Sequence, residues 1–266
     1  MLPGVYTAQK KDGSTYYRSN ITYHNKHISL GSYSSEEQAH AAYLEAQSLL
    51  TTPDITLDTL DTTPTHLPFG KKISLLNFRD NRIYFKNPIY LKQNYFLYII
   101  APHDELKFDA DDLFYYSSHK IMRRKGHLFV SDYGMQVNIL SRYGIKNFAV
   151  CGKDYQFVNG DPTDFRYSNI EVINKYYGVS KTLHKNQTYY KVKLNIIGSH
   201  VIGLYPSEIQ AAVAYNKAVD LAQAHGITKN YMTNYITELS PREYADVYTQ
   251  VIISPKFLNY LTTFCP

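Results

Sequence analysis

Acidic and imidazole side chains gather most densely between positions 103 and 119 of this chain. Carboxylates and imidazoles hold divalent cations and move protons near neutral pH, so the cluster could bind Mg²⁺ or Ca²⁺. Its spacing matches no metal-binding loop, and apolar residues such as Phe108 and Leu113 between the acids favour a helix start, where the helix dipole stabilises carboxylates. We therefore expect no metal site and no cofactor. The cluster consists of His103, Asp104, Glu105, Asp109, Asp111, Asp112 and His119.

A second polar stretch runs from 153 to 170 and has the layout of a compact motif. A short apolar strand is followed by an Asn159-Gly160 turn, a polar loop and a predicted helix start. Asp164 and Arg166 are spaced to form an ion pair, and Asn169 is placed to cap the helix.

Two other segments alternate polar and apolar residues with the period of a β-strand, which puts the polar side chains on one face. These segments are 17–23, with Arg18, Asn20 and Thr22, and 190–196, with Lys191, Lys193 and Asn195. In the major groove of DNA, Lys and Arg suit guanine and Asn suits adenine. The alternative interpretation is that these polar side chains are simply the solvated face of an edge hairpin.

These strands belong to an internal repeat of residues 4–46 and 178–218. Both copies open with Gly-Val, carry a Tyr-Tyr pair, and reach a Gly that is followed by a Tyr within Ala-rich sequence. Each copy is predicted to form three strands and then a helix, and Ser34 and Glu37 have the spacing of a capping box at the first helix. The alanines let the helix lie close on the back of the sheet, which leaves the front face open to a partner.

The repeated pattern resembles the AP2 DNA-binding domain, which also occurs in bacterial and phage integrase-like and endonuclease proteins. The resemblance covers roughly 45 residues twice, and Tyr17 and Tyr190 stand where that family has a Trp. It implies a three-stranded antiparallel sheet that enters the major groove with the helix behind it. By position, the family's DNA contacts fall on Arg18, Asn20 and Lys26 in the first copy and on Lys191, Lys193 and Asn195 in the second.

The stretch 153–170 is similar to the HNH nuclease motif, which often lies directly upstream of an AP2 domain. Phe157 stands at the position of the family's water-activating His, Gln156 at that of a metal ligand, and Phe165 at that of the central Asn. A phenyl ring cannot accept a proton, and an amide is a poor replacement for a metal-binding imidazole or carboxylate. We therefore expect an HNH-like (ββα) domain without catalytic residues, in a protein that is not an enzyme.

Further cations could contact the phosphate backbone, a salt-dependent interaction. Lys181 and Lys185 lie in the predicted turn before the second strand of the second copy. Arg123, Arg124 and Lys125 form the most basic run, ahead of a Gly turn, and a solvated hairpin explains them equally well.

The net charge of +5 is distributed unevenly along the chain. Residues 174–235 carry 7 basic and 2 acidic side chains, whereas the Thr-, Pro- and Asp-rich stretch 51–68 carries three acids and no base, as expected of a linker. We expect an AP2-like module at 1–50, the linker at 51–68, the HNH-like domain at 69–173, the second AP2-like module at 174–235 and a helical tail at 236–266.

The tail carries its own start and stop signals. Ser240, Pro241 and Glu243 have the order of N-cap, first helical residue and capping-box partner, and Ser254-Pro255 is predicted to stop the helix. We expect the tail to pack on the second repeat, although it could also make a homodimer contact.

The chain has only two cysteines, Cys151 and Cys265, and no apolar run long enough for a membrane helix. These features predict a soluble, cytoplasmic, nucleoid-associated protein. The predicted fold class is α+β, with two AP2-like modules flanking the degenerate HNH-like domain.

The predicted function is sequence-specific binding of double-stranded DNA, as a bacterial or phage transcription regulator derived from an HNH endonuclease. Two alternatives stay open. One is an active Mg²⁺-dependent homing-type nuclease that uses the acids around Asp109–Asp112. The other is an RNA- or protein-interaction module, in which some of the 27 tyrosines stack on bases or side chains.

Overall fold

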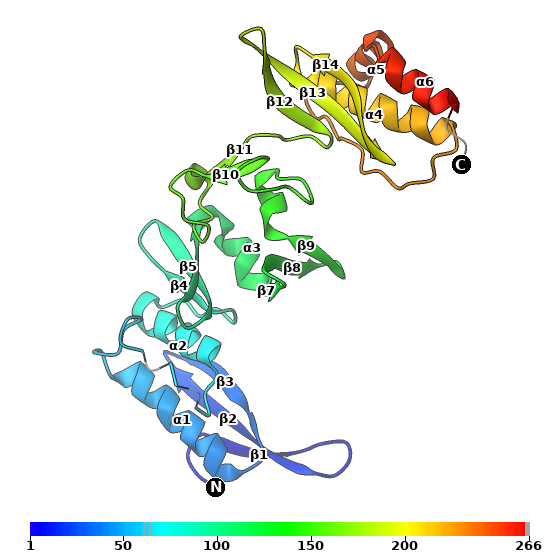
Figure 1. Ribbon diagram of the computed structural model, residues 1–266. Coiled ribbons are helices and arrows are strands. Elements are labelled where there is room, and N and C mark those ends of the chain that lie inside the picture. The colour runs from blue at the N-terminus through cyan, green and yellow to red at the C-terminus, as the bar shows by residue number, and fades with distance from the viewer. Residues whose placement is uncertain (61, 64, 264–266) are drawn as a thin grey trace. The chain divides into compact units, whose positions relative to one another are not determined.

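The computed structural model describes residues 1–60, 62–63 and 65–263 and shows an α+β protein (Figure 1). Cys265 lies outside the described residues. The packing divides the chain into two compact units. Unit 1 comprises 1–139 and 161–169, and unit 2 comprises 140–160 and the described residues from 170 onward. Among the described residues, the strands form four three-stranded antiparallel sheets and one two-stranded sheet.

Unit 1 begins with a sheet of strands β1 (Val5–Gln9), β2 (Thr15–Tyr23) and β3 (Lys26–Tyr33), backed by helix α1 (Glu36–Thr51). Ile21, Ile28 and Leu30 face α1 and are buried. The predicted close approach of the helix is confirmed, because three of its four alanines, Ala39, Ala42 and Ala46, are fully buried.

The predicted cap of α1 is wrong by one residue. The N-cap is Ser35, whose hydroxyl accepts a hydrogen bond from the Gln38 N–H at 3.3 Å. Ser34 instead donates to the Gln38 side chain at 2.9 Å. Adjacent serines both suit an N-cap, so the sequence alone does not choose between them.

The second copy forms the same elements in unit 2. Strands β12 (Val179–His184), β13 (Gln187–Ile196) and β14 (Gly198–Tyr205) are followed by α4 (Glu208–Ala224), and the helix packs behind the sheet (Figure 1). Val192 and Leu194 face the helix and are buried. The three strands and one helix predicted for each copy are confirmed.

The opening glycine of each copy pairs with the central strand next to a bulge. In each copy the register between the second and third strands shifts at a β-bulge, after Ser19 in the first and after Val192 in the second. The next N–H donates to the opening glycine: Asn20 to the Gly4 carbonyl at 2.9 Å, and Lys193 to the Gly178 carbonyl at 2.8 Å. The opening glycine thus extends the pairing of the first strand with the second by one residue, past the point where the third strand bulges.

Both opening glycines have backbone angles that disfavour other residues. The φ angles are +74° at Gly4 and +69° at Gly178, in the left-handed region. A Cβ at either position would overlap a tyrosine ring of the following helix, Tyr43 at Gly4 and Tyr215 at Gly178. This packing explains why the Gly and the helical Tyr recur together in the sequence.

In the segment that connects α1 to helix α2 (Phe69–Asn81), Leu60 and Leu67 are buried in a core that both helices share. The guanidinium of Arg79 donates to the carbonyls of Leu49 and Thr52 at 3.0 and 2.7 Å. Arg79 therefore satisfies acceptors at the C-terminal end of α1 that the helix itself leaves unpaired.

The rest of unit 1 contains two small sheets. The first is formed by β4 (Ile89–Leu91), β5 (Tyr95–Ala101) and β6 (Asp104–Asp109), and the second by β7 (Ile121–Arg124), β8 (His127–Asp132) and β9 (Met135–Asn138). A short 3-10 helix (Ala110–Asp112) and helix α3 (Leu113–Ser118) connect them. The helix start predicted for the acidic cluster is therefore confirmed.

The HNH-like stretch is divided between the two units. Strands β10 (Tyr155–Phe157) and β11 (Ile170–Val172) pair in unit 2, and residues 161–169 pack in unit 1. The predicted helix start after Asn169 is wrong, because a single 3-10 turn (Tyr167–Asn169) leads into a strand. The Asn169 amide donates to the carbonyl of Asp164 at 2.8 Å, so it folds the loop back instead of capping a helix.

The tail confirms one signal and corrects another. Helix α5 (Pro241–Gln250) begins with the predicted capping box of Ser240 and Glu243. The expected stop at Ser254-Pro255 is wrong, because α5 ends at Gln250 and Pro255 begins α6 (Pro255–Thr263). Pro is favoured in the first turn of a helix, where its missing N–H leaves no hydrogen bond unmade.

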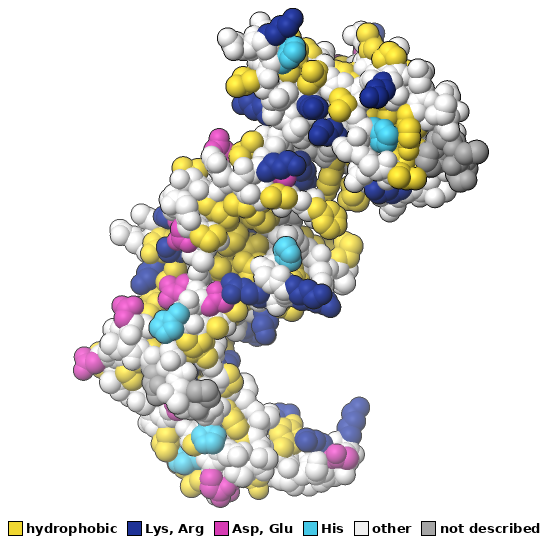
Figure 2. Space-filling model, in the orientation of Figure 1, with side chains coloured by type: hydrophobic (Ala, Val, Ile, Leu, Met, Phe, Trp, Pro, Cys, Tyr) yellow, Lys and Arg dark blue, Asp and Glu magenta, His cyan; other side chains and the backbone are white. Residues whose placement is uncertain are grey.

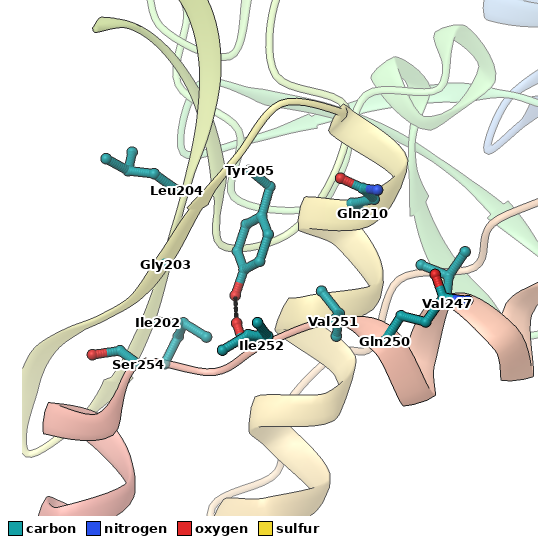
Figure 3. A pocket seen from close by; sticks show the side chains of 10 residues that line it. All are labelled: Ile202, Gly203, Leu204, Tyr205, Gln210, Val247, Gln250, Val251, Ile252 and Ser254. Atoms are coloured by element: carbon teal, nitrogen blue, oxygen red, sulfur yellow. Dashed lines mark hydrogen bonds between the residues drawn. The ribbon is translucent and has the colours of Figure 1, made fainter.

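The tail packs on the second repeat, as predicted. The Ser254 N–H donates to the Ile202 carbonyl of β14 at 2.8 Å. The Tyr205 hydroxyl donates to the Ile252 carbonyl at 2.8 Å, beside an apolar hollow of about 470 Å³ (Figure 3). Within the described residues, no helix is long and apolar enough to cross a membrane.

Candidate nucleic-acid interface

The face of sheet β12–β14 that lies opposite α4 carries Lys191, Lys193 and Asn195 in alternate positions of the central strand. Lys193 and Asn195 are exposed, and Lys191 is partly exposed. Their cross-strand neighbours on β14 are Leu204, Val201 and Ser199, which carry no charge. In this view, Lys and Arg side chains dominate the charged surface of the second module (Figure 2).

The backbone of Lys193 is held by its surroundings. Its N–H is held by the Gly178 carbonyl at the bulge, and Val192 and Leu194 on either side are buried against α4. In the described part of the chain, neither Lys191 nor Lys193 has a carboxylate partner. Two unneutralised cations on one face create a positive potential that attracts anions.

The two other predicted lysines of this module lie elsewhere. Lys181 pairs with Tyr190, and Tyr190 is on the helix side of the sheet, so Lys181 points away from Lys193. Lys185 is exposed at the tip of the two-residue turn between β12 and β13, with φ of 50°. The structure therefore does not bring Lys181 together with the open-face residues.

The first module presents a weaker version of the same face. Arg18 and Asn20 lie opposite α1, as predicted, and Arg18 Nη2 donates to the Tyr16 hydroxyl at 2.6 Å. Lys26 pairs with Tyr23 on the helix side, where its Nζ lies 5.5 Å from the centre of the Tyr84 ring. Arg18 is therefore the one cation that β1–β3 place on this open face, among the described residues.

The basic run at 123–125 forms the predicted hairpin, but its three cations have different surroundings. Arg123 makes a bidentate pair with Asp104, at 2.6 and 2.8 Å, which neutralises it. Arg124 and Lys125 are exposed, and Lys125 occupies the turn with φ of 50°. Arg123 is thus a structural residue, and the two others are available to a ligand.

The HNH-like residues make packing contacts. The Phe165 ring is buried against Phe108, with centroids 5.4 Å apart. Asp164 pairs with Arg166 as predicted, at 2.5 Å, and this carboxylate raises the pKa of the Arg166 guanidinium. Hydrogen bonds from the Thr163 hydroxyl and N–H lower the pKa of Asp161. Gln156 donates to Glu171 across the β10–β11 pair.

The acidic cluster is dispersed over several elements of unit 1. Asp104 pairs with Arg123, Asp109 accepts from the Tyr167 N–H at 2.7 Å, and His119 lies 3.6 Å from Asp132. A search of the described residues finds no group of three or more His, Cys, Asp or Glu side chains that could hold a metal ion.

The open face of the second module also contains residues that sequence reasoning missed. Ser180 pairs with Lys191, Thr182 with Tyr189 and His184 with Gln187, so these β12 side chains share the face of Lys191. The His184 and Tyr189 rings meet edge to face, with centroids 5.8 Å apart. If Lys185-Asn186 is taken as a two-residue hairpin turn, the sequence gives the register of β12 on β13 and shows that these three side chains share the face of Lys191.

Comparison with known proteins gives no relative on which to base a role for these residues. No family model matches the chain, and no curated protein and no solved structure matches it.

Proposed function

We propose that this protein binds double-stranded DNA and reads it with the open face of sheet β12–β14. The observation that carries the proposal is the alignment of Lys191, Lys193 and Asn195 on one rigid strand face that is backed by a helix. A β-ribbon of this width fits the major groove, where lysines bind the acceptor edge of guanine and an amide binds adenine.

The two copies of one architecture support an AP2-like interpretation of both modules. Each has three antiparallel strands, a bulge on the third strand and an alanine-rich helix behind. The second module supplies most of the cationic surface, and the first adds Arg18 and Asn20. Two weak contacts on one chain strengthen each other when both can reach the same duplex.

The surroundings of the HNH-like residues favour a role without DNA cleavage. Phe165 is buried in the core, and Asp164 is buried in an ion pair with Arg166. We propose that the protein regulates transcription from its DNA sites.

Selection of the purified full chain on a random duplex library tests the proposal. We expect enrichment of a defined sequence, and binding that weakens steeply as salt rises from about 50 to 200 mM. Absence of both would refute duplex reading. Incubation of plasmid with Mg²⁺ tests the nuclease alternative, and cleavage that disappears in Asp111→Ala would favour it.

A further inference from the structure

The sheet β7–β9 has an outer face whose side chains come from all three strands. Ile121 and Val130 are buried and define the core face. By the strand register, Met122 pairs with Phe129, Arg124 with His127, and Phe129 with Asn138, so these residues share the opposite face. Gln136, opposite Ser131, lies on it as well.

A shallow hollow of about 270 Å³ lies on this outer face. Its lining includes the partly exposed Phe129 together with Arg124, His127, Gln136 and Asn138. The volume is below the roughly 300 Å³ at which pockets begin to hold drug-sized ligands, so it suits one small group.

The charge of this face is uniformly positive or neutral. Asp132, the one carboxylate of the three strands, pairs with Met135 in the register and therefore lies on the core face. Arg123, which alternates onto the core face, is neutralised by Asp104, whereas Arg124 and Lys125 remain exposed next to the hollow. An aromatic ring beside unneutralised cations and amides complements a nucleotide, which has a flat base and an anionic phosphate.

We propose that this hollow binds an unpaired nucleotide of a single nucleic-acid strand, with the base stacked on Phe129. Arg124 and Lys125 hold the adjoining phosphates, and the Gln136 amide faces the edge of the base. The ligand is single-stranded because bases inside a duplex are already stacked on both faces and cannot cover a protein ring.

The site does not depend on duplex reading by sheet β12–β14. A DNA-binding protein with such a site would hold a single strand in addition to its duplex target. A protein with only this site would bind single strands and fail the duplex selection, so the two proposals can fail separately.

The test measures the anisotropy of labelled single strands of about ten nucleotides, within the site sizes of single-strand-binding folds. Oligodeoxythymidylate and oligouridylate are used in parallel to separate DNA from RNA. Phe129→Leu removes the ring and keeps an apolar side chain, whereas Phe129→Tyr keeps an aromatic ring. Phe114→Leu is the control, because it makes the same change at a residue that is 90% exposed on α3.

We expect Phe129→Leu to weaken single-strand binding by about tenfold, the effect of losing one stacked base, and Phe129→Tyr and Phe114→Leu to bind as the unmodified protein does. Arg124→Ala, at an exposed position, should weaken binding and flatten its salt dependence, even if the Phe129 variants fold poorly. Unmodified protein that binds neither oligonucleotide would overturn the site. Equal binding by Phe129→Leu and Phe114→Leu, or no effect of Arg124→Ala, would overturn it too. Duplex binding, recorded for the same preparations, is scored separately.

Discussion

Lys181 and Lys193 lie on adjacent strands of one sheet and point to opposite sides of it. Lys193 shares the open face with Lys191 and Asn195, whereas Lys181 is opposite Tyr190 on the side of α4. Two lysines of the same module that were both predicted to contact DNA are therefore separated by the thickness of the sheet. This difference provides matched variants with the same change of charge.

Lys193→Ala should weaken binding to the selected duplex by about tenfold, because a lysine on a base edge or a phosphate contributes roughly 1–3 kcal/mol. If Lys193 contacts a phosphate, the slope of log affinity against log salt should also fall by about one. Lys181→Ala is the control and should have the smaller effect. Fluorescence anisotropy at several salt concentrations measures the affinity of both variants and its salt dependence. Equal losses of affinity in Lys193→Ala and Lys181→Ala would show that only net charge matters.

Gly178→Ala should lower the free energy of unfolding by about 2–4 kcal/mol, because strain at positive φ adds to overlap with the Tyr215 ring. Gly198 has a similar φ of +85°, but a Cβ there meets nothing within 4 Å. Gly198→Ala should therefore cost only the backbone strain of about 1–2 kcal/mol. Urea unfolding measures the difference, and equal costs would argue against the close packing of Gly178 on Tyr215.

Lys72→Met should lower the free energy of unfolding of unit 1 by about 3 kcal/mol. Lys72 Nζ lies 2.9 Å from Glu45, and its side chain is only 3% exposed. Removal of one partner leaves a partly buried carboxylate without its cation. Adding Glu45→Gln should recover part of the loss, since no unpaired charge then remains. A double-mutant cycle in urea gives the coupling, and strictly additive effects would contradict it.

The Lys175–Glu238 pair should make the stability of unit 2 depend on pH in the acid range. The hydrogen bond from Lys175 lowers the pKa of Glu238 from 4.5 to about 2. A carboxyl whose pKa is lower in the folded state stabilises fully above its unfolded pKa and loses this contribution as pH falls through the folded value. Both side chains are largely exposed, so solvent screening keeps the contribution small.

Urea unfolding of the protein and of Glu238→Gln, measured between pH 6 and pH 2, tests this linkage. The unmodified protein should be more stable than the variant at pH 6, and the difference should shrink between pH 4.5 and pH 2. A difference that stays constant over this range would contradict the lowered pKa.

The local patterns in the sequence predicted the elements of both modules. Alternation placed Ile21 and Leu194 in the core and Arg18 and Lys193 on the open face, and the Ser240–Glu243 capping box was visible directly. These features depend on side chains within one strand or one helical turn, whose periodicity fixes their direction.

Features that depend on distant partners could not be predicted. The neutralisation of Arg123 follows from Asp104 on another sheet, and no local pattern indicates it. Likewise, nothing near Asn169 indicates that its amide turns back to the Asp164 carbonyl. Strand register and ion pairing are tertiary properties, and one residue of register reverses the face on which a side chain lies.

Residues 161–169 pack in unit 1 although the chain on both sides of them belongs to unit 2. Their backbone is joined to β6, where the Lys107 N–H donates to the Thr163 carbonyl at 2.9 Å. During synthesis the ribosome must therefore deliver all of 140–160 before unit 1 can acquire its last segment, and nascent domains otherwise fold in order from the N-terminus. A chain released before residue 165 would leave Phe108 without the ring of Phe165 to cover it.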